Sequence, residues 1–204
     1  MELNAQDIIT WMHKTNERLQ NNKDYLTTLD QAIGDGDHGI NMARGFKEVV
    51  NKLDNENYET ASDALRDTAM TVMSKVGGAS GPLYGTAFLK LATSLKGIDP
   101  VDESSFKTGL EEALAGVKQR GKSDQGEKTL IDVWIPVMEL FDNNFSPEKL
   151  TDTAEKAMEN TKDMKATKGR ASYLGDRSIG HLDPGSVSSF YLFTSLADTV
   201  KGGE

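Results

Sequence analysis

Hydrophobic positions recur at helical spacing along almost the whole chain. Apolar residues three or four positions apart form one face of an α-helix, and eight such faces can be traced. They span Ile8–Leu19, Ala43–Leu53, Ala61–Val76, Tyr84–Leu95, Phe106–Val117, Leu130–Phe141, Leu150–Met158 and Val187–Tyr191. No convincing run of alternating or β-branched residues remains for a sheet. The pattern predicts an all-α bundle or barrel of about eight amphipathic helices, antiparallel because most connections are short.

Several helix starts are marked by residues that cap helices. Asn4 precedes the first face and has Asp7 in the first turn, a combination typical of an N-terminus. Ser146 and Asp183 each stand directly before a proline, which is favoured at the first helical position. Pro136 lies inside the sixth face, where we expect it to bend the helix.

Glycine gathers in four of the predicted connections. The four groups are Gly34–Gly39, Gly77–Gly81, Gly121 with Gly126, and Gly169–Gly185. A single glycine connection is usually a helix C-cap or a tight turn. Four of them, one rich in acids and another carrying arginines, indicate a mouth at one end of the bundle where the backbone approaches a ligand.

Asp30, Asp35 and Asp37 lie within eight residues of one another, with no cation among them. A solvated acidic turn is one interpretation, because aspartate and glycine both favour turns. A divalent metal is the other, since Mg²⁺ binds through a few carboxylates together with substrate phosphates. In that case Asp37 could cap the next helix, and the amides of residues 38–41 would face phosphate oxygens. Arg170 or Arg177 would supply positive charge to a phosphoryl group in transfer.

Composition narrows the class of protein. A chain of 204 residues suits one domain, residues 1–204. The absence of cysteine fits a reducing compartment, and no leader or bilayer-length apolar stretch stands out, so a cytoplasmic protein is expected. A net charge of −9 disfavours nucleic acid and anionic membranes as partners.

Familiar motifs are matched only superficially. Residues 34–39 spell the dinucleotide fingerprint but follow no hydrophobic strand, and an EF-hand begun at Asp35 has the wrong residues at its ligand positions. Residues 77–85 lack the lysine of a P-loop. His13 reads as a surface residue. His38 and His181 border glycine connections, where a hydrogen-bonding or helix-terminal role is favoured over a phosphorylated histidine.

Four ordered motifs resemble the L subunit, or L domain, of dihydroxyacetone kinases. They are Leu29–Gly39, Gly77–Gly85, Lys168–Gly175 and Gly180–Gly185, and together the resemblance covers essentially the whole chain. It implies an eight-helix antiparallel barrel with a nucleotide site in the loops at one end. It also implies that Asp30, Asp35 and Asp37 hold two Mg²⁺ ions that bridge the phosphates of tightly bound ADP or ATP.

The resemblance also implies which residues contact the nucleotide and which one is catalytic. Arg170 is the expected catalytic residue, with Arg177 left open as the alternative. The family often has methionine where Leu130 stands, and leucine should keep an apolar contact with the base. The nucleotide pocket would be lined by His38, Gly39, Ile40, Asn41, Ala79, Ser80, Gly121, Leu130, Arg170, Asp183, Pro184 and Gly185.

The family has a fused ATP-dependent form and a form made of separate subunits. Because the chain holds little beyond this domain, it resembles the separate subunit of the phosphotransferase-system enzyme. There, a phosphohistidine on the M subunit phosphorylates ADP in place, and the phosphoryl group passes to dihydroxyacetone on the K subunit. A homodimer is also compatible with the sequence. The alternatives are a nucleotide-state sensor that docks to a regulatory protein and a phosphoryl donor for another small ketose.

Overall fold

The computed structural model describes residues 1–142 and 145–202, and nine α-helices make up most of this part of the chain. The helices are α1 (Ala5–Asn21), α2 (Lys23–Ile33), α3 (His38–Asp54), α4 (Ala61–Lys75), α5 (Ser80–Ser94), α6 (Glu103–Gly121), α7 (Ile131–Leu140), α8 (Pro147–Asn160) and α9 (Pro184–Gly202). Two 3₁₀-helices, η1 (Thr161–Asp163) and η2 (Arg170–Ser178), lie between α8 and α9. The prediction of an all-α fold is confirmed.

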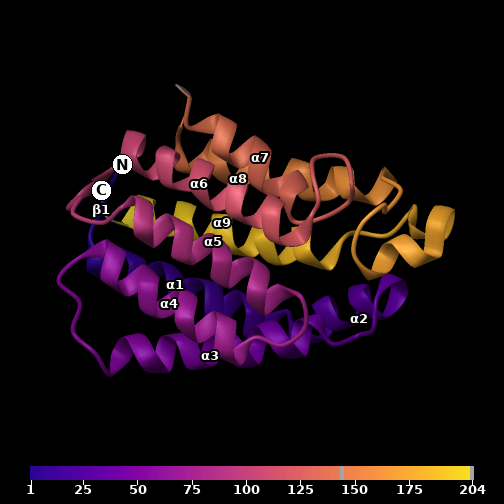
Figure 1. The fold of residues 1–204 in the computed structure, drawn as a ribbon, viewed down its shortest axis with the longest axis horizontal. Helices are drawn as coiled ribbons and strands as arrows, with labels where there is room; N and C mark the ends of the chain where they lie inside the picture. Colours follow the sequence, from indigo (N-terminus) through magenta and orange to yellow (C-terminus); the bar gives the residue numbers. More distant parts are fainter. Residues whose placement is uncertain (143–144, 203–204) are drawn as a thin grey trace.

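Eight of the helices form a closed ring. Each of α3 to α8 packs against the next helix in the sequence, and α1 packs against both α3 and α9, which closes the ring. The helices lie side by side along the long axis of the molecule (Figure 1). These eight helices correspond to the eight predicted apolar faces, and the faces point into the ring, where they bury a continuous core.

The ninth helix, α2, lies at one end of the ring and was not predicted. It follows α1 after a break at Asn22 and buries Leu26, Asp30 and Ile33. The marked ends of the chain lie at the opposite end of the molecule (Figure 1). There a short antiparallel pair of strands, β1 (Glu2–Leu3) and β2 (Val101–Asp102), ties the start of the chain to the start of α6. The expectation that no strands form was wrong for these four residues, because two-residue strands carry no detectable alternation.

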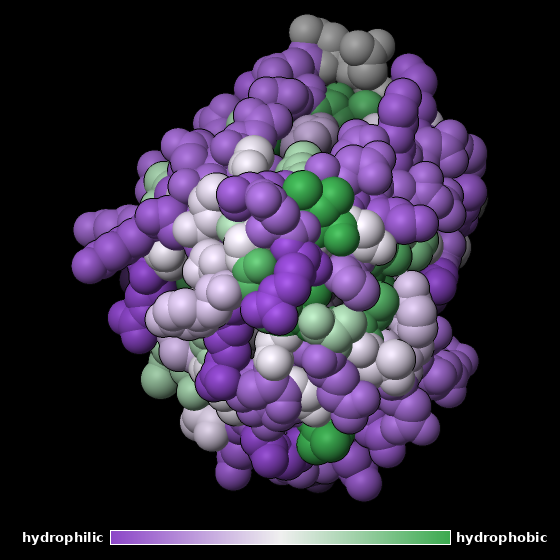
Figure 2. Space-filling view, turned by 90° about the vertical axis from the view of Figure 1, so that its right-hand side faces the viewer, coloured by the Kyte–Doolittle hydropathy of each residue, from purple (hydrophilic) through white to green (hydrophobic). Residues whose placement is uncertain are grey.

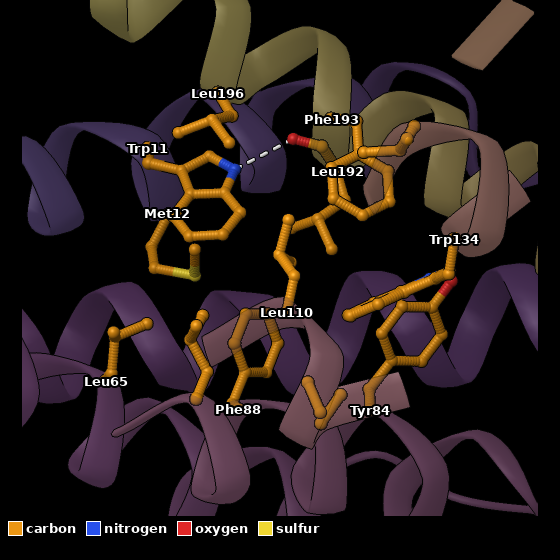
Figure 3. Packing of buried hydrophobic residues seen from close by; sticks show 14 of the residues in the cluster. Trp11, Met12, Leu65, Tyr84, Phe88, Leu110, Trp134, Leu192, Phe193 and Leu196 are labelled. Carbon is orange, nitrogen blue, oxygen red and sulfur yellow. Dashed lines mark hydrogen bonds between the residues drawn. The ribbon is translucent and has the colours of Figure 1, made fainter. Parts of the chain in front are cut away.

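Aromatic side chains fill the middle of the ring (Figure 3). Trp11 packs edge-on against Phe88, and its indole N–H donates to the carbonyl oxygen of Leu192 at 2.8 Å. Trp134 packs edge-on against Phe193. Burying a large aromatic side chain and satisfying its polar atom both favour one fixed arrangement. The core therefore holds α1, α5, α7 and α9 in a defined register, and their ends position the connections.

Three of the predicted helix caps are confirmed. Asn4 and Asp7 form a reciprocal capping box at α1, and Ser146 accepts a hydrogen bond from the amide of Lys149 ahead of Pro147. Asp183 accepts from the amide of Ser186 at the start of α9. None of the helices in the described ranges is long and apolar enough to cross a bilayer.

Candidate nucleotide and metal site

The three aspartates converge where α2 ends and α3 begins. Asp30 lies in the last turn of α2, Asp35 in the four-residue connection, and Asp37 directly before α3. One carboxylate oxygen from each lies within 4.8 Å of the others. Hard oxygen ligands gathered at this spacing match the preference of Mg²⁺ for carboxylates.

Backbone hydrogen bonds set the position of the first carboxylate. Oδ2 of Asp30 accepts from the amides of Asp37 at 2.8 Å and His38 at 3.1 Å. The prediction that Asp37 caps α3 was wrong: Asp37 makes no side-chain cap, and Asp30 satisfies the first amides of the helix from the neighbouring helix. A Cβ atom on Gly34 would lie 2.0 Å from Oδ1 of Asp30, so only glycine leaves room for this carboxylate.

Arg170 reaches the aspartate cluster from the far end of the sequence. Its Nη1 lies 2.8 Å from Oδ2 of Asp35. A small apolar cluster of Ile33, Ala166 and Ala171, with Leu174 packed against it, attaches η2 to the end of α2. Arg170 therefore adds positive charge to the acidic group.

Of the two candidate arginines, the structure places Arg170 at the cleft. Arg177 lies on the same 3₁₀-helix, is exposed, and is not among the residues that line the cleft.

A cleft opens beside the aspartates at this end of the ring, the end that faces the viewer in Figure 2. Hydrophobic residues lie among hydrophilic ones on this face (Figure 2). The cleft walls come from the α2–α3 connection, the start of α5, the connection before α7, the segment before η2 and the start of α9. The lining residues are Asp30, Ile33, Gly34, Asp35, Asp37, His38, Gly77, Gly78, Ala79, Ser80, Leu83, Lys128, Thr129, Leu130, Lys168, Gly169, Arg170, Ala171, Asp183, Pro184 and Gly185.

Most residues predicted to bind nucleotide lie in the cleft wall. The eight that do are His38, Ala79, Ser80, Leu130, Arg170, Asp183, Pro184 and Gly185. The structure does not place Gly39, Ile40, Asn41 or Gly121 in the wall.

Each of these four residues has different surroundings. Gly39 is packed against α2, where a Cβ atom would lie 2.1 Å from the carbonyl oxygen of Lys23, and Ile40 is half exposed. Asn41 is buried and accepts a hydrogen bond from Arg44, and Gly121 is the last residue of α6. The roles of all the predicted contacts stay predictions.

His38 is buried beneath the cleft and is hydrogen-bonded through both ring nitrogens. Nδ1 lies 3.0 Å from the hydroxyl of Ser80, and Nε2 lies 2.9 Å from the hydroxyl of Ser188. Burial lowers the pKa of His38 to about 4, although Asp30 and Asp37 act in the opposite direction. The imidazole is therefore neutral near pH 7 and orients Ser80, in line with the predicted hydrogen-bonding role.

The other two histidines lie outside the cleft wall. His13 is exposed on α1, as predicted, and lies 2.7 Å from a carboxylate oxygen of Asp54. His181 is exposed, and its backbone carbonyl accepts a hydrogen bond from Lys128.

Asp183 caps α9 from inside the protein. Its Oδ2 accepts from the amide of Ser186 at 2.7 Å and from the Ser186 hydroxyl at 2.9 Å. Burial raises the pKa of Asp183 to about 6, against the opposing effect of these hydrogen bonds. This carboxyl group is thus close to changing its charge in the neutral range.

Sequence reasoning missed several residues of the wall. Lys128 and Thr129 stand before Leu130 in the connection to α7, and Lys128 is buried. A lone lysine in a polar segment gives no signal of burial. Lys168 could have been predicted as a wall residue, because it begins the motif Lys168–Gly175 and stands two positions before Arg170.

Fold and site together define a class of all-helical domain in which a closed ring of helices carries an acidic, glycine-lined cleft at one end. The chain belongs to the DAK2 domain family, whose model matches residues 32–198.

Several curated proteins are similar over nearly their whole length. The chain is 50% identical over 192 residues to the ADP-binding subunit of PEP-dependent dihydroxyacetone kinase 1 of Listeria innocua, covering 94% of each chain. It is 48% identical over 193 residues to the ADP-binding subunit of the PTS-dependent dihydroxyacetone kinase of Lactococcus lactis, covering 94% of this chain and 96% of that one. The corresponding PEP-dependent subunit of Escherichia coli is 40% identical over 209 residues, covering 98% and 100%.

A solved structure shows the same fold. The dihydroxyacetone kinase of C. freundii, in complex with AMP-PNP and Mg²⁺, superimposes with a TM-score of 0.75 at 22% identity. The match covers 97% of this chain and 34% of that chain.

Proposed function

We propose that the protein is the ADP-binding subunit of a phosphoenolpyruvate-dependent dihydroxyacetone kinase and that it holds the nucleotide through two Mg²⁺ ions. The observation that carries the proposal is the convergence of Asp30, Asp35 and Asp37 at a cleft that also receives Arg170. The similarity to ADP-binding subunits over nearly the whole chain supports the same function.

The aspartates fit a pair of hard cations. Three carboxylates within 4.8 Å of one another repel, and one arginine at Asp35 offsets only part of that repulsion. Asp30 is held by two backbone amides, so its free oxygen has a fixed place to offer to a metal. When bound, Mg²⁺ would neutralise phosphate charge and ADP would carry the phosphoryl group between partner subunits.

The chain's own groups would orient the nucleotide and neutralise its charge. The start of α5 at Ser80 lines the cleft and presents the positive end of a helix dipole to anions. Arg170 would place its guanidinium beside the transferred phosphoryl group. Leu83 and Leu130 give the cleft an apolar side, suited to the nucleoside, away from the charged aspartates.

The partners follow from the proposed reaction. A phosphohistidine M subunit would supply the phosphoryl group, and a K subunit would present dihydroxyacetone. Both must reach the same cleft, so they would dock in turn at the end of the ring that carries α2 and η2.

Titration calorimetry with ADP, with and without Mg²⁺, tests the site, and native mass spectrometry counts the bound ions. We expect Mg²⁺-dependent binding by the wild type and a loss of at least about tenfold in affinity for Asp37→Asn, because a charged ligand is removed. Asp24→Asn is the matched control, since Asp24 is an exposed carboxylate on α2 outside the cluster. In a system reconstituted with both partner subunits, Arg170→Ala should abolish transfer while the circular dichroism of the helices persists. Absence of Mg²⁺-dependent ADP binding by the wild type would overturn the proposal.

A further inference from the structure

Lys128 carries an ammonium group inside the protein. It lies in the connection between α6 and α7, in the cleft wall, and only 1% of its surface is exposed. Lysine is almost never fully buried unless its charge is paired. Taking an ammonium group out of water costs free energy, and burial lowers the pKa of Lys128. Groups around the side chain must therefore compensate for its charge.

Three backbone carbonyl oxygens provide this compensation. Nζ of Lys128 donates to Thr161 at 2.7 Å, to Met164 at 3.1 Å and to His181 at 2.6 Å. An ammonium group has three donors, so these contacts use all of them and leave none for a phosphate oxygen. Lys128 thus joins three segments that are distant in sequence: its own connection, the end of α8 with η1, and the approach to α9.

Two of the joined segments carry cleft walls. Thr129 and Leu130 follow Lys128 directly, and the approach to α9 leads into Asp183–Gly185. Two more contacts close the junction: the amide of Asp183 donates to Thr161 Oγ1 at 3.2 Å, and the Ser186 hydroxyl, which also contacts Asp183, lies 2.9 Å from the carbonyl oxygen of Thr129. The spacing between the two walls therefore depends on the contacts of Lys128 and Thr161 together with the direct contact between Ser186 and Thr129.

We propose that Lys128 is a positioning residue of the nucleotide pocket, whose ammonium group fixes the wall carrying Leu130 relative to the wall carrying Asp183. The inference rests on the proposed ADP site and adds to it a residue that acts through the backbone. The aspartate cluster is positioned by different contacts, those that Asp30 accepts from α3. Loss of the Lys128 contacts should consequently weaken the binding of a nucleotide more than that of a metal-bound phosphate without a nucleoside.

Lys128→Met keeps most of the unbranched side chain and removes its donors. Affinity is measured by calorimetry for two probes, ADP and inorganic pyrophosphate, each with Mg²⁺. We expect a loss of about tenfold or more for ADP and less than about twofold for pyrophosphate, because the unpaired carbonyls disturb only the two walls. Lys128→Arg keeps the donors and should recover part of the ADP affinity.

Lys122→Met is the matched control. Lys122 lies in the same connection and also has a left-handed backbone, with φ of 50° against 62° for Lys128. Its side chain is exposed, so both affinities should stay at the wild-type level.

The remaining outcomes decide against the inference. Equal losses for ADP and pyrophosphate would show a general structural role, and unchanged ADP affinity would show that the contacts do not position the walls. If Lys128→Met does not fold, Lys128→Gln, which keeps two donors, is judged by the same comparison. A wild type that binds no ADP overturns the proposed function together with this inference, whereas normal ADP binding by the Lys128 variants overturns the inference alone.

Discussion

Replacing Asp30 should separate the building of the site from the binding of metal, because one carboxylate serves both. Its Oδ2 accepts hydrogen bonds from the amides of Asp37, directly before α3, and His38, the first residue of α3, and the group is largely buried. Hydrogen bonds to a charged group contribute about 1.5–3 kcal/mol each, and loss of a helix cap costs about 0.5–2 kcal/mol. Relief of repulsion from Asp35 and Asp37 acts in the opposite direction.

From these contributions we expect Asp30→Ala to lower the free energy of unfolding by about 2 kcal/mol in metal-free protein. For a domain of this size that corresponds to a melting temperature about 4–8 °C lower. Asp30→Asn keeps an oxygen acceptor for the amides and should lose less than about 1 kcal/mol. Both variants should lose Mg²⁺-dependent ADP binding, because neither has the charged ligand.

Asp35→Asn is the companion variant, since Asp35 contacts Arg170 in a partly exposed ion pair, which contributes only about 0–1 kcal/mol. It should lose binding with little change in stability. Thermal unfolding in EDTA and calorimetry with Mg²⁺ and ADP give the two measurements. If Asp30→Ala and Asp30→Asn have the same melting temperature, the capping role of Asp30 is refuted. If Asp30→Asn binds like the wild type, the metal role is refuted.

Two further predictions concern the glycine beside the cluster and the buried carboxyl group at α9. Gly34→Ala would place a methyl group 2.0 Å from Oδ1 of Asp30, so the carboxylate must move. Calorimetry should then show a loss of about tenfold or more in Mg²⁺-dependent ADP affinity. An unchanged affinity would contradict the assigned position of Asp30. Burial raises the pKa of Asp183 from 3.8 to about 6, so its contribution to stability is full below pH 3.8 and is lost as the pH rises through 6. The always neutral Asp183→Asn should therefore gain about 3 kcal/mol in unfolding free energy relative to the wild type between about pH 4 and pH 8, measured by denaturant titration in EDTA. A pH-independent difference would show that Asp183 titrates normally.

The sequence predicted the ring of helices well because each of its eight helices turns a regular apolar face to one core. The helix α2 was missed for a physical reason. Its buried face consists of Leu26, Asp30 and Ile33, and the central position carries a carboxylate of the proposed metal site. Leu26, Leu29 and Ile33 do stand at helical spacing, but the helix has only eleven residues and its last turn carries the first aspartate of the acidic motif, so the sequence pattern did not separate it from the connection to α3.

The candidate site was predictable where its chemistry is local. The aspartates lie close together in the sequence, and their repulsion makes a cation one of the two interpretations that the sequence offers, beside a solvated acidic turn. The capping role went to Asp30 rather than Asp37 because the capping oxygen comes from a neighbouring helix, which no local motif reports. The burial of Lys128 was not predictable, because its partners are backbone carbonyls of distant segments. Every residue has such a carbonyl, so the residue types do not identify the partner.

Charge balance at the cleft bears on the number of ions. The three ionised carboxylates and Arg170 together carry a net charge of −2, and ADP would add about −3 at neutral pH. A single Mg²⁺ would leave this group of charges at about −3 in a partly buried cleft, where like charges repel more strongly than in water. Two ions reduce the charge to about −1, a balance that the positive ends of α3 and α5 can stabilise. The charge balance among these groups therefore supports the proposed ion count, and one ion per bound ADP would mean that one of the aspartates does not bind the metal.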